Sequence, residues 1–112
     1  MTTAEISLEA ALAAVGARTD SRSVELLRHG TLTVKMYAPR GHDPQTPHAQ
    51  DEIYVIAKGH GQFFDGEKLI PVTIGDLLFA AAGQPHRFEN FSDDFATWVM
   101  FYGPDGGEAG RT

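Results

Sequence analysis

The spacing of apolar residues changes from helical to strand-like after the first 23 residues. Apolar side chains recur at helical spacing from Leu8 to Val15, with Ser7 as a candidate N-cap and Gly16 after the last turn. Because so short a helix is marginal in water, we expect it to pack on the rest of the protein or on a partner subunit. The sequence therefore predicts an N-terminal arm with one short helix, residues 1–23.

Short β-rich runs separated by turn signals fill the chain from residue 24 to residue 102. Polar and apolar side chains alternate over 31–38, the pattern of a half-buried strand, and Asp65-Gly66 is a hairpin signal. The predicted strands are 24–28, 31–38, 52–57, 62–64, 68–72, 77–80, 86–91 and 95–102. Many short strands at regular spacing indicate an all-β sandwich or barrel. The glycine-rich segment 103–112 is predicted to be a flexible tail.

Composition excludes several classes of function. The 112 residues suffice for one domain, here predicted to span 1–112. The net charge is −6 and the nine basic residues are scattered, which argues against nucleic acid as a partner. No apolar run is long enough for a membrane span, and the N-terminus lacks the basic region of a signal peptide. Without cysteine there is no disulfide or thiolate chemistry, and we predict a cytoplasmic protein.

Two histidines and one carboxylate are the candidate metal ligands. His48 and Glu52 stand at the start of an apolar, β-branched run, and His86 follows Glu52 by 34 residues. If His48 and Glu52 belong to one strand, both point to the same face, and closure of the sheet would bring in His86. Burying an unpaired carboxylate costs roughly several kcal/mol, and a divalent cation would remove this cost. The apolar lining of the site is expected to come from some of five large side chains, those of Tyr54, Phe79, Phe88, Trp98 and Met100.

The same stretch resembles the first motif of the cupins, in which a His-x-His pair is followed by a glutamate and, after six residues, a glycine. Glu52 and Gly59 have this separation, and His48 takes the place of the second histidine. The second cupin motif consists of a glycine, a Pro-x-Gly, a histidine and an asparagine. It is matched by Gly75, Gly83, His86 and Asn90, with Ala81 in place of the proline. The resemblance runs from about Thr31 to Tyr102, most of the chain.

This resemblance implies an antiparallel jelly-roll β-barrel, also called a double-stranded β-helix, with one metal ion inside. The first histidine of the motif falls on Thr46, which is a poor ligand, so the implied set is reduced to His48, Glu52 and His86. Two imidazoles and a carboxylate suit Fe(II) and also Zn, Mn, Co or Ni. His42 or Gln45 would be the candidates for a fourth ligand.

Each candidate ligand also has a structural interpretation. His48, next to a proline, has the setting of a surface-loop histidine. Glu52 could pair with Lys58 or Arg87 on a solvated face, and His86 could be a rim residue bonded to a backbone carbonyl. The metal hypothesis therefore depends on the three side chains meeting in space.

Two functions are consistent with these residues. The first is a metal-dependent enzyme of the dioxygenase, isomerase or lyase type that acts on a small polar molecule, with Gln50, Tyr54 and Arg87 as candidate substrate contacts. The second is a non-catalytic barrel that binds or senses a sugar or organic acid, with a structural or absent metal. The resemblance further implies a homodimer, and a dimeric barrel whose site has decayed is a third interpretation.

Overall fold

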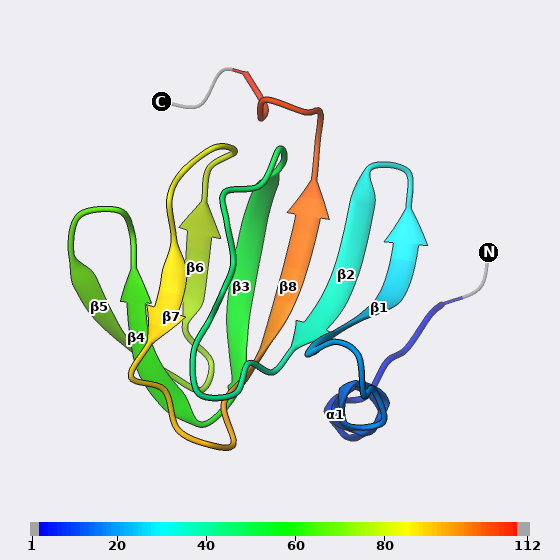
Figure 1. The fold of residues 1–112 in the computed structure, drawn as a ribbon. Helices are drawn as coiled ribbons and strands as arrows, with labels where there is room; N and C mark the ends of the chain where they lie inside the picture. Colours follow the sequence, from blue (N-terminus) through cyan, green and yellow to red (C-terminus); the bar gives the residue numbers. More distant parts are fainter. Residues whose placement is uncertain (1–2, 110–112) are drawn as a thin grey trace.

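Two antiparallel sheets face each other in the computed structural model of the protein, which describes residues 3–109 (Figure 1). One sheet has the strand order β1-β2-β8-β3-β6 and the other β5-β4-β7. The elements are α1 (Leu8–Gly16), β1 (Ser23–His29), β2 (Leu32–Tyr37), β3 (Asp51–Lys58), β4 (His60–Phe64), β5 (Leu69–Thr73), β6 (Leu77–Ala80), β7 (Arg87–Glu89) and β8 (Ala96–Tyr102). This is the predicted all-β jelly roll with one short helix, built as two facing sheets rather than one continuous ring.

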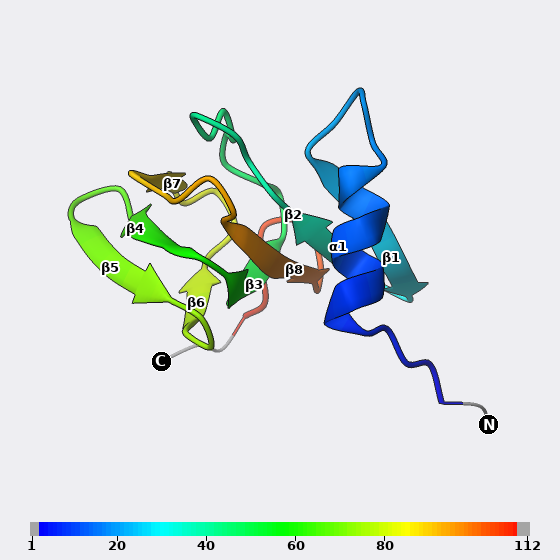
Figure 2. The same ribbon diagram turned by 90° about the horizontal axis from the view of Figure 1, so that it is seen from below.

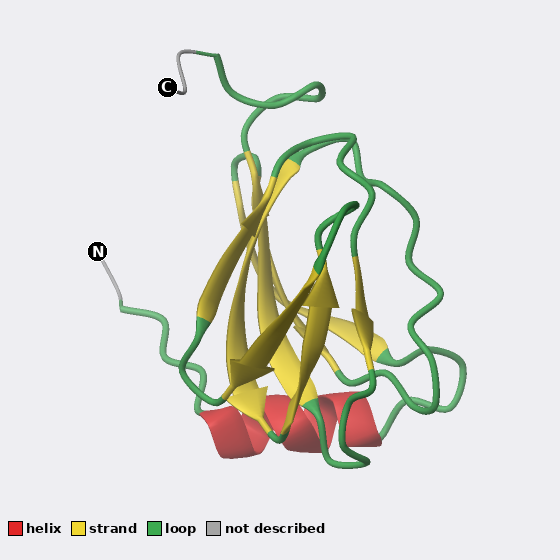
Figure 3. Ribbon diagram, turned by 90° about the vertical axis from the view of Figure 1, so that its left-hand side faces the viewer, coloured by secondary structure: helices red, strands yellow, loops and turns green. Residues whose placement is uncertain are grey.

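The helix α1 covers the outer face of the five-stranded sheet, next to β1 and β2 (Figures 2 and 3). The Ser7 hydroxyl accepts a hydrogen bond from the Ala10 amide at 3.1 Å, which confirms the predicted N-cap. Ala11 and Val15 are buried against a cluster that includes Met36. Packing on the sheet thus stabilises a helix too short to persist alone. Within residues 3–109, no helix has the length and apolar character needed to cross a membrane.

The pleat of β3 decides which side chains enter the space between the sheets. Tyr54 pairs with Val99 of β8, and both belong to the buried core together with Phe63 and Phe88. Trp98, one position along β8, points to the opposite face and packs against the helix cluster. Of the aromatic residues expected to line the site, Tyr54 and Phe88 therefore lie between the sheets and Trp98 does not.

The chain after β8 folds back over the end of the barrel. The Gly106 amide donates to the Ala49 carbonyl at 2.7 Å, and the Glu108 amide donates to the Asp51 carboxylate at 2.9 Å. The part of this segment that the structure describes, 103–109, differs in this respect from the flexible tail that its composition predicts. The residues that hold this segment, Ala49 and Asp51, lie more than 50 residues earlier in the chain. No local sequence pattern reveals such a contact.

Gly59, in the turn between β3 and β4, is required for both its conformation and its lack of a side chain. Its φ is +75°, and a Cβ there would lie 2.3 Å from Ser92 Oγ and 3.0 Å from the Phe95 Cα. We expect Gly59→Ala to lower the free energy of unfolding by about 3 kcal/mol, from the left-handed conformation and the steric clash together. Gly75→Ala is the control, since Gly75 has φ +91° with nothing within 4 Å of its Cβ position, and should lose only about 1 kcal/mol. Urea denaturation of both variants measures this, and equal losses would contradict the steric argument.

Candidate metal centre

Glu52 is the second residue of β3, and its carboxylate is buried between the sheets. In the ladder it pairs with Phe101 of β8 on one side and Ala80 of β6 on the other. Only 1% of its side chain is exposed. A carboxylate in such surroundings needs compensating positive charge or hydrogen-bond donors.

His86 approaches Glu52 from the loop that precedes β7. Its Nδ1 lies 2.8 Å from the carbonyl oxygen of Gln84, so in the neutral ring Nδ1 carries the proton and donates to that carbonyl. The Gln84 side chain in turn bonds the amide of Ala81 and the carbonyl of Asp65, which fixes the shape of the loop. The neutral imidazole therefore turns the lone pair of Nε2 toward Glu52, the orientation of a metal-binding histidine.

His48 lies in the connection between β2 and β3, which runs beside β3 before turning into it (Figure 1). The strand that carries Glu52 begins at Asp51, next to its predicted start at residue 52, so His48 lies outside it and the alternation of a strand does not bring the two side chains together. Two contacts outside the strand position the residue instead. The His48 carbonyl accepts from the Gly83 amide at 2.8 Å, and its ring packs edge-on against Phe101, with centroids 4.9 Å apart.

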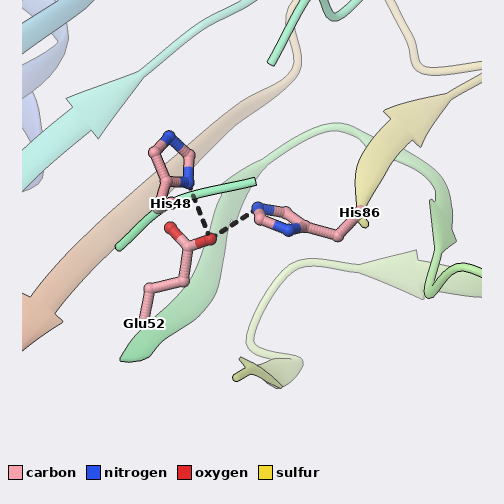
Figure 4. Close-up of side chains that lie close together, drawn as sticks. All are labelled: His48, Glu52 and His86. Atoms are coloured by element: carbon pink, nitrogen blue, oxygen red, sulfur yellow. Dashed lines mark hydrogen bonds and ion pairs between the residues drawn. The ribbon is translucent and has the colours of Figure 1, made fainter. Parts of the chain in front are cut away.

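The three side chains converge on one point (Figure 4). Glu52 Oε1 lies 2.5 Å from His86 Nε2 and 3.2 Å from His48 Nδ1, and the candidate ligand atoms lie within 4.8 Å of one another. Despite this proximity, Glu52 Oε2 and His86 Nε2 are buried without a hydrogen-bond partner of good geometry. An imidazole lone pair and a carboxylate oxygen at this distance repel unless a proton or a cation is shared between them.

The electrostatics of the cluster favour a charged carboxylate. Burial alone would raise the pKa of Glu52, but its interactions with His48 and His86 outweigh burial and hold that pKa below its ordinary value. Burial alone would lower the pKa of His86, but Glu52 and the Gln84 carbonyl outweigh it, so the pKa of His86 is raised. The cluster thus holds an anionic oxygen that attracts a positive charge, either a proton on His86 or a metal ion.

These residues fit a divalent metal. Two imidazole nitrogens and one carboxylate form a ligand set suited to Fe(II), Zn, Mn, Co or Ni, and three ligands leave coordination positions for water or substrate. His48 is the most open of the three, with 34% of its side chain exposed, while the side chains of Glu52 and His86 are each 1% exposed. A small molecule would therefore reach such an ion from the side of His48.

The structure also locates the candidates for a fourth ligand. Thr46 and His42 are exposed, and neither belongs to the cluster. Gln45 lies closer, in the pocket that includes His48. Its amide oxygen accepts from the Tyr54 hydroxyl at 2.9 Å, and would have to give up that bond or share its second lone pair to bind a metal.

Asp43 is a buried carboxylate that sequence reasoning did not single out. It accepts hydrogen bonds from the Tyr37 hydroxyl, from the side-chain amide of Gln45 at 2.6 Å and from the backbone amide of Phe88 at 2.8 Å. Burial and the carboxylate beside it raise the pKa of Tyr37, so that hydroxyl stays protonated and donates. Asp43 thereby ties the connection that carries His48 to β7, the strand that follows His86. An aspartate between prolines carries no sequence signal of this role.

The three predicted substrate contacts have other partners. The Gln50 amide donates to the carbonyls of Thr31 and Gly103, at 3.1 and 2.9 Å. Tyr54 is fully buried, and burial raises the pKa of its hydroxyl. Arg87 is exposed, and its guanidinium lies 2.6 Å from a Glu89 carboxylate oxygen.

A pocket of about 270 Å³ lies beside the candidate metal centre. Its lining includes Lys35, Tyr37, Gln45, His48, Val99 and Phe101. A larger pocket of about 480 Å³, between the connection at His42 and strand β7, includes Arg87 but none of the three candidate ligands. A third pocket, also of about 270 Å³, shares Lys35, His48 and Phe101 with the first and includes Gln50, so both of these smaller pockets reach the metal centre through His48.

Comparison with known proteins agrees with this geometry. The sequence model of the Cupin_2 family, described as a cupin domain, matches residues 33–102. An uncharacterised protein of Streptomyces coelicolor, SCO3923, is 32% identical over 96 residues, which are 84% of this chain and 91% of that protein.

Two further similar proteins have names that state a function. The oxalate-binding protein of Thermotoga maritima is 44% identical over 39 residues, which are 35% of this chain and 32% of that protein. The crystal structure of the DMSP lyase DddQ from Ruegeria pomeroyi superposes with a TM-score of 0.63 at 26% identity, over 72% of this chain and 46% of that one. This chain thus spans less than half of either protein.

Proposed function

Since this chain belongs to the cupin family, we propose that it binds one divalent metal ion through His48, Glu52 and His86 and uses it to bind and transform a small polar molecule. The observation that supports this most is the pair of buried atoms Glu52 Oε2 and His86 Nε2, which have no hydrogen-bond partner of good geometry. Buried polar atoms in native proteins almost always have partners, and a metal ion would supply one for both.

A bound metal would supply Lewis acidity, or dioxygen activation in the case of iron. The protein's own contributions are positional. The Gln84 carbonyl orients His86, Phe101 packs against the His48 ring, and the core aromatic residues keep water from Glu52. The similarity to the lyase DddQ and to the oxalate-binding protein supports an acidic or otherwise polar small molecule as the substrate.

A non-catalytic binding barrel is the second candidate, and one observation favours it. Near the cluster, the tyrosine hydroxyl of Tyr54 is committed to Gln45 and the Gln50 amide to two backbone carbonyls. The Tyr54 hydroxyl is therefore not free to act as a general acid or base at the metal, and the Gln50 amide is not free to bind a substrate. Screening metal-loaded protein for binding and for turnover with the same compounds separates the two candidates.

We also propose a homodimer that pairs through the outer face of the five-stranded sheet. Beyond the area covered by α1, this face presents an apolar row of partly buried residues that includes Val34, Ile53, Phe79 and Met100. Leu77 on the edge strand β6 is 64% exposed. Such a surface is more typical of an interface than of a monomer. Cytoplasmic location and a lack of nucleic-acid or membrane partners stay predictions from composition.

Elemental analysis of protein purified without a histidine tag tests the metal proposal. We expect about one equivalent of a transition metal. Treatment with a chelator should lower the melting temperature, because a ligand whose free concentration is a hundred times its Kd stabilises the folded protein by about 2.7 kcal/mol. Adding the metal back should restore the melting temperature. Less than about a tenth of an equivalent, both as purified and after reconstitution, would contradict the proposal.

A further inference from the structure

Lys35 is a cation in the pocket beside the metal centre. The nearby Glu25 carboxylate, whose pKa is lowered by Arg28 and to a smaller extent by Lys35, is the anion that it senses. Lys35 lies on β2 opposite Val99 of β8, and its ammonium is 5.8 Å from the centroid of the Phe101 ring. Among residues 3–109, no carboxylate lies within ion-pair distance of it. Glu25, opposite Lys35 in the β1–β2 ladder, instead binds Arg28 at 2.6 Å.

Besides Lys35, the pocket has a further side-chain donor, Gln45, and an acceptor, Tyr37. The Gln45 amide nitrogen gives one hydrogen to Asp43 and has a second one available. The Tyr37 hydroxyl already donates to Asp43, so its oxygen can only accept. With the ammonium of Lys35, this arrangement favours a ligand rich in acceptor oxygens. Lys35 is the one lysine or arginine among the described residues that line this pocket.

Lys35 and the candidate metal are separated by an aromatic ring. Phe101 lies next to the ammonium on one side, and its ring centroid is 4.9 Å from that of His48 on the other. A ligand that touches both Lys35 and an ion held by His48 must therefore span the edge of this ring. Two acceptor groups joined by a short carbon chain meet this requirement, whereas two adjacent carboxylates do not.

We propose that Lys35 recognises the distal carboxylate of a small dicarboxylate-type anion whose other end binds at the metal centre. This proposal rests on the proposed function, because the proximal end of the anion needs the ion. The apolar walls, Val99 and Phe101, suit the methylene groups between the two carboxylates. Lys35 is then a specificity residue, and its effect should grow with the separation of the two charges.

Isothermal titration calorimetry on metal-loaded protein tests the proposal with succinate, its neutral analogue succinamide, and oxalate as probes. We expect succinate to bind and succinamide to bind far more weakly. Lys35→Met should weaken succinate binding at least about tenfold, the loss of one charge-assisted hydrogen bond, and should affect oxalate less. Lys35→Arg keeps the charge and should stay within about threefold of the wild type. Lys68→Met, at an exposed hairpin position, is the matched control and should leave binding unchanged.

The metal content of every sample, measured first, separates the two proposals. If the wild type holds the metal but does not bind succinate, or if Lys35→Met binds succinate as the wild type does, the role of Lys35 is wrong while the metal proposal stands. If no sample takes up a metal, both proposals are overturned, because the anion then lacks its proximal contact. Thermal melts of the variants confirm that each is folded.

Discussion

Glu52→Gln should abolish tight metal binding while leaving the barrel folded. The substitution keeps the shape of the side chain but removes the charge at the centre of the cluster, where Glu52 Oε1 lies within 3.2 Å of nitrogen atoms of both histidines. Loss of groups that merely support metal ligands costs 10- to 100-fold in affinity, so loss of the charged ligand itself should cost at least about 100-fold. Titration with Co²⁺, followed by its visible absorption, measures this directly.

The metal-free protein should tolerate the same change. A glutamine N–H can donate to Nε2 of a neutral His86, so that a neutral hydrogen bond replaces the ion pair between Glu52 and His86. The unfolding free energy without metal should therefore change by only about 1 kcal/mol. Glu67→Gln, at an exposed position in the hairpin after β4, is the control and should bind metal as the wild type does. Unchanged affinity in Glu52→Gln would remove the basis for a metal at this position.

Asp43→Ala should be the most destabilising of the polar substitutions. It would leave the buried amide of Phe88 and the hydroxyl of Tyr37 without an acceptor, and release the side chain of Gln45. Each buried donor without a partner costs about 1–3 kcal/mol, so the total loss should be at least about 3 kcal/mol. Urea denaturation of the metal-free protein measures this loss.

The same substitution should weaken metal binding indirectly. Asp43 holds the connection that carries His48, so its loss frees one of the three ligands to move away from Glu52. Asp43→Asn, which keeps one acceptor oxygen, should show a smaller effect on both measurements. Asp93→Ala, at an exposed turn position, should stay within about 0.5 kcal/mol of the wild type. Normal metal affinity in a strongly destabilised Asp43→Ala would show that the connection does not position His48.

The local patterns that predicted the fold are those with a local physical cause. Alternating side chains mark strands because the pleat has a period of two, and Asp65-Gly66 marks a turn because Gly66 adopts a positive φ, here +99°. The cap at Ser7 likewise depends only on residues within one helical turn. These features need no knowledge of distant parts of the chain.

The spatial relations of the site depend on long-range contacts, and there the local reasoning was incomplete. His48 lies outside β3, where the Gly83 amide and the Phe101 ring position it, so strand alternation does not account for its approach to Glu52. The Gln50 amide, a predicted substrate contact, donates to the carbonyls of Thr31 and Gly103, which lie near each other because β2 pairs with β8. Nothing near Asp43 in the sequence indicates that its carboxylate would accept from the amide of Phe88.

The sequence by itself determined the pattern of short strands, the single short helix and the three candidate metal ligands, because periodicity and motif spacing express these features locally. Only the tertiary structure decided that the three side chains meet in a buried cluster, that Asp43 holds their supporting connection, and that Lys35 faces the same pocket. The reason is that hydrogen-bond partners and burial are set by which strands pair across the sheets, and strand pairing joins residues that are far apart along the chain.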